Sequence, residues 1–321
     1  MNPTSLQVRV ARKVREALDI CTFELMDVGG RPLPAFAAGS HIDVHLLDGI
    51  TRQYSLCSDP QESHRYLIGV LKDPATRGGS RAMHDSVNEG DTLTISPPRN
   101  HFPLAHEAVH SVLLAGGIGV TPILCMAERL AISAGSFEMH YATRSRERTA
   151  FYERIGGGGF ASKVQFHFDV GADEQKLQLA TLLAAPKAGV HLYVCGPKGF
   201  MDAVLGTARA KGWPEPQIHY EYFSAEPVKS LADGSFAVQL ASSGKIVPVS
   251  GDQTVTQALA AAGIEVLTSC EQGVCGTCIT RVLQGEPDHR DLYFTPEERA
   301  RNDQFTPCCS RSRSPLLVLD L

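Results

Sequence analysis

The sequence lacks several features that would place it in well-known protein classes. No run of apolar residues approaches the roughly 20 that span a bilayer. No H-E-x-x-H, G-x-S-x-G or P-loop motif is present, which disfavours zincin, hydrolase and P-loop functions. No secretory apolar region follows Met1, so we expect a cytoplasmic protein without a membrane partner.

The sequence also carries little net charge. Its 30 Lys and Arg against 35 Asp and Glu give −5, which argues against nucleic acid as a partner. With so little charge to steer association, we expect contact with a protein partner to be local and transient.

Length and cysteine content are more informative. A chain of 321 residues with 43% hydrophobic content predicts two to three globular domains. Nine cysteines is an odd number, and without an export signal a disulfide framework is not expected. Five of the nine lie between positions 270 and 309, and this crowding indicates metal chemistry.

The first two thirds of the chain contain two different patterns. Residues 1–103 show short alternating strands separated by Gly, Pro and Asp, which predicts an antiparallel β-barrel. Residues 104–225 alternate buried strands with helices, starting with the strand at 111–115 and a helix from Pro122 to about Ala131. This pattern predicts an α/β domain with a parallel sheet.

The last third forms a separate region. Residues 226–235 have the composition of an exposed linker. Residues 236–321 open with a predicted hairpin over 236–249, and Thr254 and Gln257 then form a capping box for a short helix. Three domains therefore fit better than two.

The cysteine-rich region contains the most specific motif. Cys270, Cys275 and Cys278 form C-x4-C-x2-C, and Cys308 follows at a distance, which is the spacing of a plant-type [2Fe–2S] cluster. Zinc is the competing metal, although it favours paired C-x2-C units. Unliganded structural cysteines are the other alternative.

Two details of this motif concern its neighbours. Gly273 and Gly276 tolerate positive φ, so backbone N–H groups can turn toward the cluster sulfurs. Cys308 and Cys309 are adjacent, and only one of them can be the fourth ligand. The spacing favours Cys308, with Cys309 as a small buried side chain.

Two turns indicate nucleotide binding. Ala115–Pro122 contains Gly116, Gly117 and Gly119 between a strand and a helix, where a pyrophosphate can approach the backbone. Cys195-Gly196-Pro197 repeats the strand–turn–helix arrangement. A tight structural turn would explain either one alone, but two at the ends of parallel strands predict a dinucleotide crevice.

The barrel region contains a third candidate site. In Arg52-Gln-Tyr54-Ser55, an arginine can hold a phosphate, an aromatic ring can cover a ring system, and a hydroxyl can bond a polar ring edge. An ordinary edge strand is the alternative. Arg77–Arg81 is a second basic turn, and it could be merely an exposed loop.

One alternating set of polar residues has an ordinary interpretation. His41, Asp43 and His45 could be imagined as metal ligands. We expect instead an exposed polar face of a strand.

Taken in order, these motifs resemble those of the phthalate dioxygenase reductase family over essentially the whole chain. The tail adds to the likeness, because Cys308-Cys-Ser-Arg-Ser and the final strand at 316–321 match the family's C-x-S-R-A ending. The resemblance implies a β-barrel flavin domain, an α/β nucleotide domain and an α+β ferredoxin domain of the β-grasp type. It also supports Cys308 as the fourth cluster ligand.

The family implies FMN, NADH and a [2Fe–2S] cluster as cofactors, with Ser55, Thr121 and Cys195 at the reacting rings. The residues implied to contact the flavin or the nucleotide are Arg52, Tyr54, Ser55, Leu71, Lys72, Gly79, Ser80, Gly116, Gly117, Gly119, Thr121, Arg144, Cys195, Gly196, Pro197 and Phe223. Arg144 and Arg146 follow a strand at a place where a 2′-phosphate could bind, so NADPH stays possible.

The implied function is that of the reductase component of a Rieske-type oxygenase, which passes electrons from NADH through FMN and the cluster to the terminal oxygenase. Three alternatives remain. The same electron chain could serve a diiron monooxygenase or a P450, the protein could be a non-enzymatic redox carrier or sensor, or it could be a free flavin reductase with a vestigial cluster.

Overall fold

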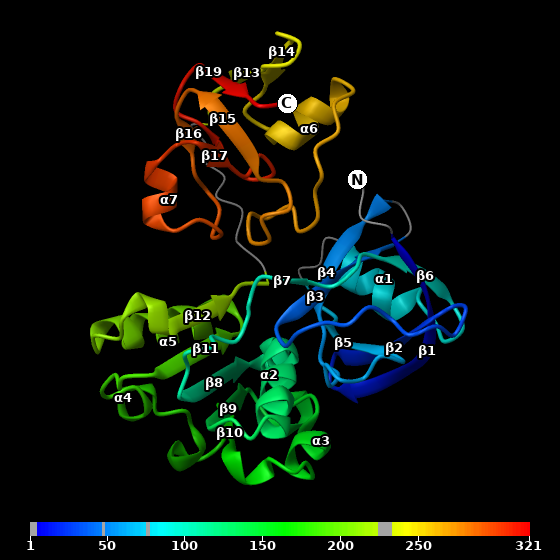
Figure 1. Cartoon of the computed structure of the whole chain (residues 1–321), viewed down its shortest axis with the longest axis vertical. Helices are drawn as coiled ribbons and strands as arrows, with labels where there is room; N and C mark the ends of the chain where they lie inside the picture. The colour runs from blue at the N-terminus through cyan, green and yellow to red at the C-terminus, as the bar shows by residue number, and fades with distance from the viewer. Residues whose placement is uncertain (1–4, 47–48, 75–77, 224–232) are drawn as a thin grey trace. The chain divides into compact units, whose positions relative to one another are not determined.

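A computed structural model describes residues 5–46, 49–74, 78–223 and 233–321 (Figure 1). Contacts divide the chain into two compact units, Met1–Glu221 and Tyr222–Leu321. The first unit contains both the barrel and the parallel sheet, and the second contains the cysteine motif. Most of the predicted linker 226–235 and the predicted boundary at residue 225 lie outside the described residues, so the predicted domain limits stay predictions.

The barrel is a sheet of alternating strands that curls and closes. Its strand order is β4-β3-β6-β1-β2-β5, with β7 paired to β3, and all of these pairings are antiparallel. A bridge between Leu56, just after β4, and Ile68 in β5 joins the two ends. The elements are β1 (Leu6–Ala17), β2 (Ile20–Asp27), β3 (Ser40–His45), β4 (Thr51–Ser55), β5 (Tyr66–Leu71), α1 (Gly79–Asp85), β6 (Thr92–Ile95) and β7 (Arg99–Asn100).

The expectation of an exposed polar face on β3 is wrong for two of its three residues. His41 and Asp43 are buried, and only His45 is exposed. The physical reason is that β7 pairs with this strand and brings Arg99 into an ion pair with Asp43. Gln53 donates a second hydrogen bond to Asp43 at 3.0 Å, so the buried carboxylate is satisfied.

The second half of the first unit is the predicted parallel α/β structure. The strand order is β10-β9-β8-β11-β12, and all of these strands are parallel. The chain adds strands on one side of β8 as far as β10 and then on the other side from β11, so the strand order reverses between β8 and β11. The elements are β8 (His110–Gly116), α2 (Val120–Ile132), β9 (Phe137–Thr143), α3 (Tyr152–Gly156), β10 (Val164–Phe168), α4 (Leu179–Leu182), β11 (Val190–Cys195), α5 (Lys198–Ala210) and β12 (Ile218–Glu221).

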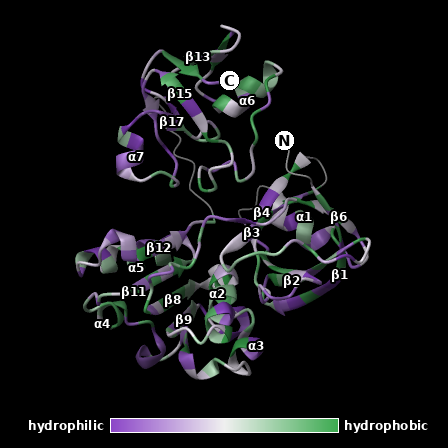
Figure 2. Cartoon of the chain, viewed as in Figure 1, coloured by the Kyte–Doolittle hydropathy of each residue, from purple (hydrophilic) through white to green (hydrophobic). Residues whose placement is uncertain are grey.

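The two halves of the first unit share a core, which explains why they form one compact body. Ile20 and Cys57 of the barrel belong to the same buried cluster as Leu124 of α2. Gly69 in β5 permits a close approach of the two halves, because a Cβ there would lie 2.9 Å from the Cγ2 of Thr121. Figure 2 shows α2, which lies at this junction, as predominantly hydrophobic.

The second unit is a five-stranded sheet with two short helices and a small additional ladder. The sheet order is β14-β13-β19-β15-β17, and the predicted hairpin and capping box are both confirmed. The elements are β13 (Phe236–Leu240), β14 (Ile246–Val249), α6 (Val255–Ala261), β15 (Thr280–Gln284), β16 (Pro287–Asp288), α7 (Pro296–Ala300), β17 (Gln304–Phe305), β18 (Arg311–Ser312) and β19 (Leu316–Leu319). Within the described ranges, no helix is long and apolar enough to cross a membrane.

Candidate functional site

The two glycine turns predicted from sequence lie against each other. They follow β8 and β11, which are adjacent parallel strands, and Cys195 pairs with Ala115 in register. A Cβ on Gly119 would overlap the carbonyl oxygen of Cys195, and one on Gly116 would lie 2.8 Å from the ring of Phe200. Because these strand ends flank the reversal of the sheet, they form the position where doubly wound sheets bind dinucleotides.

The residue missed by sequence reasoning is Glu221, at the end of β12. Its Cα is paired with that of Cys195, and the Ser55 hydroxyl donates to its Oε2 at 3.3 Å. Ser55 comes from the barrel, so this bond joins the two halves of the unit. Desolvation by the surrounding protein raises the pKa of Glu221 to about 8. The signal that could have identified it is the short run Ile218–Glu221, which has the pattern of a strand and ends on an acidic residue.

Cys195 and Thr121 complete this convergence. Cys195 is fully buried, and burial raises the pKa of its thiol well above the usual value, so the thiol is neutral. Thr121 is also buried, and its hydroxyl donates to the Ile118 carbonyl at 3.1 Å while its methyl faces Gly69 of the barrel. Ser55, Thr121 and Cys195 therefore all belong to the junction of barrel and parallel sheet.

The predicted phosphate turn of the flavin site lies at the start of α1. Gly79 and Ser80 are its first residues, and the preceding Gly78 has φ of 95°. A Cβ on Gly79 would overlap the Cγ of Arg52, so this glycine lets the arginine cross the helix start. A guanidinium beside a helix N-terminus is a suitable cradle for a phosphate.

The other predicted flavin contacts are distributed around this region. Tyr54 is half-buried, and burial raises the pKa of its phenol. Leu71 ends β5, and the Lys72 ammonium lies 2.6 Å from Asp85 of α1. Phe223 is 38% exposed and lies in the second unit, so its placement over the flavin stays a prediction.

The cluster loop, defined here as residues 270–278, carries three of the four predicted cluster ligands. Each of the four thiols is less than 8% exposed. The side chain of Cys270 interacts with those of Cys275 and Cys308, and the side chain of Cys308 also interacts with that of Cys278, so the four sulfurs lie close together.

The backbone of the cluster loop turns toward these sulfurs as predicted. The N–H groups of Gln272 and Thr277 donate to the Sγ atoms of Cys270 and Cys275 at 3.4 and 3.5 Å. Gly273 and Gly276 both have φ of 71°. A Cβ on Gly276 would lie 2.5 Å from the Tyr293 ring, so side chains are excluded there. Four buried thiols with backbone donors are a donor set that fits a [2Fe–2S] cluster.

Cys309 faces a different direction from Cys308. Its Sγ lies 3.3 Å from the Thr306 hydroxyl and contacts Gly273 at the back of the cluster loop. The side chain of Cys308 interacts with those of Cys270 and Cys278, whereas that of Cys309 interacts with Cys308, Thr306 and Ser310, so the geometry agrees with the sequence preference for Cys308.

The two arginines after β9 have different surroundings. The guanidinium of Arg146 forms an ion pair with Glu153 at 3.0 Å and lies over the Tyr152 ring at 4.5 Å. Its charge is therefore paired, and its planar face is stacked on an aromatic ring. Arg144 is exposed. The backbone N–H of Asp169, just after β10, donates to the Thr143 carbonyl at 3.0 Å, which places an exposed carboxylate at the same sheet edge.

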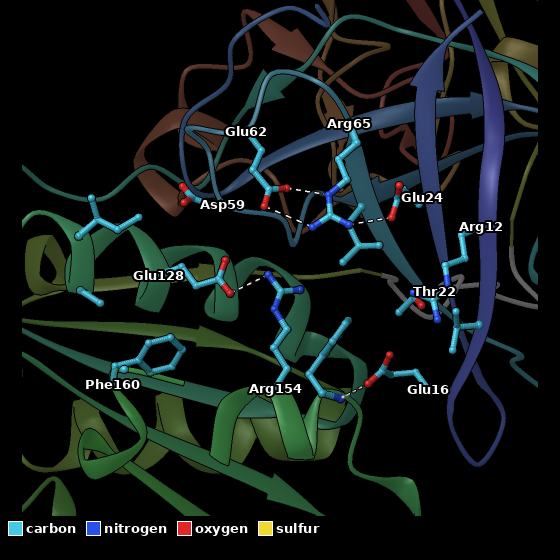
Figure 3. Close-up of a pocket in the computed structure, with 16 residues that line it drawn as sticks. Arg12, Glu16, Thr22, Glu24, Asp59, Glu62, Arg65, Glu128, Arg154 and Phe160 are labelled. Carbon is cyan, nitrogen blue, oxygen red and sulfur yellow. Dashed lines mark hydrogen bonds and ion pairs between the residues drawn. The ribbon is translucent and has the colours of Figure 1, made fainter. Parts of the chain in front are cut away.

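The first unit also has a charged cavity of about 810 Å³, which does not coincide with the predicted sites (Figure 3). Arg65 lies between Glu62 and Glu24, and Arg154 contacts Glu128 at 2.6 Å. Burial raises the pKa of Glu128. The cavity walls come from the barrel, α2 and α3, so the cavity follows the junction of the two halves. Its lining residues are Arg12, Val14, Glu16, Thr22, Glu24, Asp59, Glu62, Arg65, Leu67, Glu128, Ala131, Ile132, Phe151, Arg154, Gly159 and Phe160.

Two family profiles match the chain. Residues 238–313 match the 2Fe-2S iron-sulfur cluster binding domain, which covers the cluster loop and Cys308. Residues 92–218 match the N-terminal domain of dimethylamine monooxygenase subunit DmmA-like proteins, which covers the parallel sheet.

Full-length relatives and solved structures agree with these profiles. The chain is 59% identical to vanillate O-demethylase oxidoreductase of Pseudomonas putida over 95% of this chain and 96% of that protein. It is 39% identical to phthalate dioxygenase reductase of Burkholderia cepacia over 98% and 97% of the two chains. A solved phthalate dioxygenase reductase, described as a modular structure for electron transfer from pyridine nucleotides to [2Fe–2S], superposes with a TM-score of 0.78, 38% identity and coverage of 99% and 98%. An intact type IV self-sufficient cytochrome P450 monooxygenase gives a TM-score of 0.85 at 41% identity, and the match covers 99% of this chain and 41% of that one. The chain therefore belongs to the phthalate dioxygenase reductase family.

Proposed function

We propose that this protein is the reductase component of a Rieske-type oxygenase system and delivers electrons from NADH, by way of FMN and a [2Fe–2S] cluster, to the terminal oxygenase. The observation that carries the proposal is the meeting of Ser55 from the barrel with Glu221 and Cys195 at the sheet reversal. A nucleotide held by the glycine turns would reach the strand end that carries Ser55, because Glu221 and Cys195 lie on neighbouring strands. The relative of highest identity reported above, an O-demethylase oxidoreductase, supports an oxygenase as the electron acceptor.

Residues of the barrel and of β12 form the flavin site. Arg52, with Gly79 and Ser80 at the start of α1, binds the flavin phosphate. Ser55 and the protonated Glu221 offer hydrogen bonds at the polar edge of the flavin. When bound, FMN converts a two-electron hydride into single electrons that an iron–sulfur centre can carry.

A second set of residues binds the nucleotide, and a third set holds the cluster. Gly116, Gly117 and Gly119 allow the pyrophosphate to approach the backbone, while Cys195 and Thr121 shape the space for the nicotinamide. Cys270, Cys275, Cys278 and Cys308 hold the cluster, and the backbone N–H groups of the cluster loop stabilise its negative charge.

The surroundings of the adenosine edge favour NADH over NADPH. Arg146 is already engaged by Glu153 and Tyr152. The carboxylate of Asp169 at the same edge suits a ribose hydroxyl and repels a 2′-phosphate. We also propose a cytoplasmic location, because NADH is an intracellular donor and none of the nine cysteines, all of them in the described ranges, forms a disulfide.

An anaerobic titration of the purified protein tests these assignments. NADH should bleach the flavin absorbance and produce a low-temperature EPR signal from the reduced cluster, and NADPH should do so much less efficiently. Extraction of the flavin and its mass distinguish FMN from FAD. Absence of either the flavin or the cluster signal would overturn the proposal.

A P450 is the second candidate for the electron acceptor, because the chain superposes on 41% of a self-sufficient P450 monooxygenase. Anaerobic mixing of the NADH-reduced protein with a Rieske oxygenase or with a P450 separates the two. Faster reduction of the Rieske centre supports the main proposal, and faster reduction of the haem supports the alternative.

A further inference from the structure

The small overall charge of the chain is unevenly distributed between its two units. Residues 1–221 contain 22 Lys and Arg and 23 Asp and Glu, whereas residues 222–321 contain 8 and 12, as counted along the sequence. The second unit thus carries −4 of the total −5. A bound [2Fe–2S] cluster with four thiolates adds further negative charge to this unit. The small total therefore hides a strongly acidic electron-donating unit.

The arginines of the second unit are each paired with a nearby carboxylate. Each of its six arginines lies within 4.0 Å of a carboxylate: Arg281, Arg290, Arg299, Arg301, Arg311 and Arg313. The ammonium of Lys245 donates to the Ala262 carbonyl at 2.7 Å. Within the part of the chain that the structure describes, Glu265 and Glu297 make no ion pair, so they contribute to the excess negative charge.

These two glutamates lie on the segments that flank the cluster loop. Glu265 is five residues before Cys270, and it is exposed. Glu297 lies in the first turn of α7 and is exposed as well. α7 is fixed beside the cluster loop because Arg299 bonds the Asp291 carbonyl, and Asp291 packs against Gly273.

Exposed apolar side chains occupy the same flanking segments. Leu267 is 68% exposed and lies three residues before Cys270. Leu292 is 39% exposed, and its N–H donates to the Gly273 carbonyl at 2.9 Å. Exposed leucines and carboxylates on the same segments are the two kinds of residue that protein interfaces combine in an apolar centre and a polar rim.

We propose that Glu265, Leu267, Leu292 and Glu297, the cluster-edge surface, dock a basic face of the terminal oxygenase that has an apolar centre. This inference rests on the proposed function and specifies the partner's docking chemistry. Negative charge beside the cluster steers a basic partner to the place where the electron leaves, and Leu267 and Leu292 stabilise the short-lived complex. The first unit, at −1, offers much less charge complementarity to this surface.

The test uses the holoprotein with the oxygenase component of the Pseudomonas putida vanillate O-demethylase system as the probe. Glu297→Lys should lower the second-order rate constant of oxygenase reduction roughly 5-fold at low salt, and the difference should shrink as ionic strength rises. Leu292→Ser should lower it roughly 10-fold at every salt concentration. Glu174→Lys is the matched control, because it makes the same charge change at an exposed position of the first unit.

Two further measurements separate the possible outcomes. Ferricyanide reduction and NADH-driven reduction of the protein's own cluster should be unchanged in both variants. If the variants slow reduction of their own cluster, the surface serves the first unit and the inference is wrong. If wild type and variants reduce the oxygenase equally, the inference fails while the proposed function stands. If wild type reduces ferricyanide but neither this oxygenase nor any other, the proposed function itself fails.

Discussion

Glu221→Gln replaces a titratable group that the fold holds in its protonated form. The pKa of Glu221 is raised from the usual 4.5 to about 8, chiefly by desolvation. Between these two pH values the folded protein binds one more proton than the unfolded chain. The free energy of unfolding therefore falls as pH rises through this window, by up to about 1.4 kcal/mol per pH unit.

Across this whole pH window the free energy of unfolding falls by at most about 5 kcal/mol, because the two pKa values differ by about 3.5 and each pKa unit corresponds to about 1.36 kcal/mol. Glu221 keeps some exposure, and solvent around the carboxylate lowers this ceiling. Glutamine has the shape of the protonated acid and still accepts from Ser55. The stability advantage of the variant over the wild type should therefore be smallest near pH 5 and should grow until about pH 8.

Urea unfolding of the holoprotein, followed by flavin release at pH values from 5 to 9.5, measures this difference. The flavin signal reports on the first unit. Glu174→Gln at an exposed position is the control, and its difference from wild type should not vary with pH. A Glu221→Gln variant whose difference from wild type is also the same at every pH would show that the carboxyl is not held protonated.

Three other substitutions test the sites directly. Gly119→Ala introduces a Cβ that overlaps the Cys195 carbonyl, so we expect NADH-driven flavin reduction to slow at least 10-fold in stopped flow with flavin content unchanged; an unaffected rate would contradict the contact. Cys308→Ser should abolish the reduced-cluster EPR signal whereas Cys309→Ser should keep it, and the reverse result would exchange the two roles. Asp169→Ser should improve kcat/KM for NADPH about 10-fold, and an unchanged ratio of NADPH to NADH efficiency would remove Asp169 from the specificity argument.

Features set by local sequence could be predicted. The capping box at Thr254 needs only two residues three positions apart. The C-x4-C-x2-C loop is similar, because the positive φ of its glycines and its N–H donors follow from a short segment. The strand that precedes the glycine turn is equally evident, because its residues form a continuous buried apolar run.

Features that depend on distant segments could not be predicted in this way. Glu221 has its role only because the fold places Ser55, which is 166 positions earlier in the chain, within hydrogen-bond distance of its carboxyl group. His41 and Asp43 are buried because β7 pairs with their strand, and a two-residue strand leaves little trace in sequence. The uneven charge between the units is present in the sequence but becomes meaningful only once the units are delimited.

The contact between Gly69 and Thr121 has a consequence for making chimeric reductases. Thr121 of the nucleotide half packs against Gly69 of the barrel so closely that there is no room for a Cβ on Gly69. The surfaces of the two halves are therefore complementary to each other in detail. Exchanging the barrel alone with that of a relative would bring together surfaces that never adapted to each other. A crossover after Glu221 keeps this contact whole and transfers only the iron–sulfur unit, so new electron acceptors should be reached by recombination at that point.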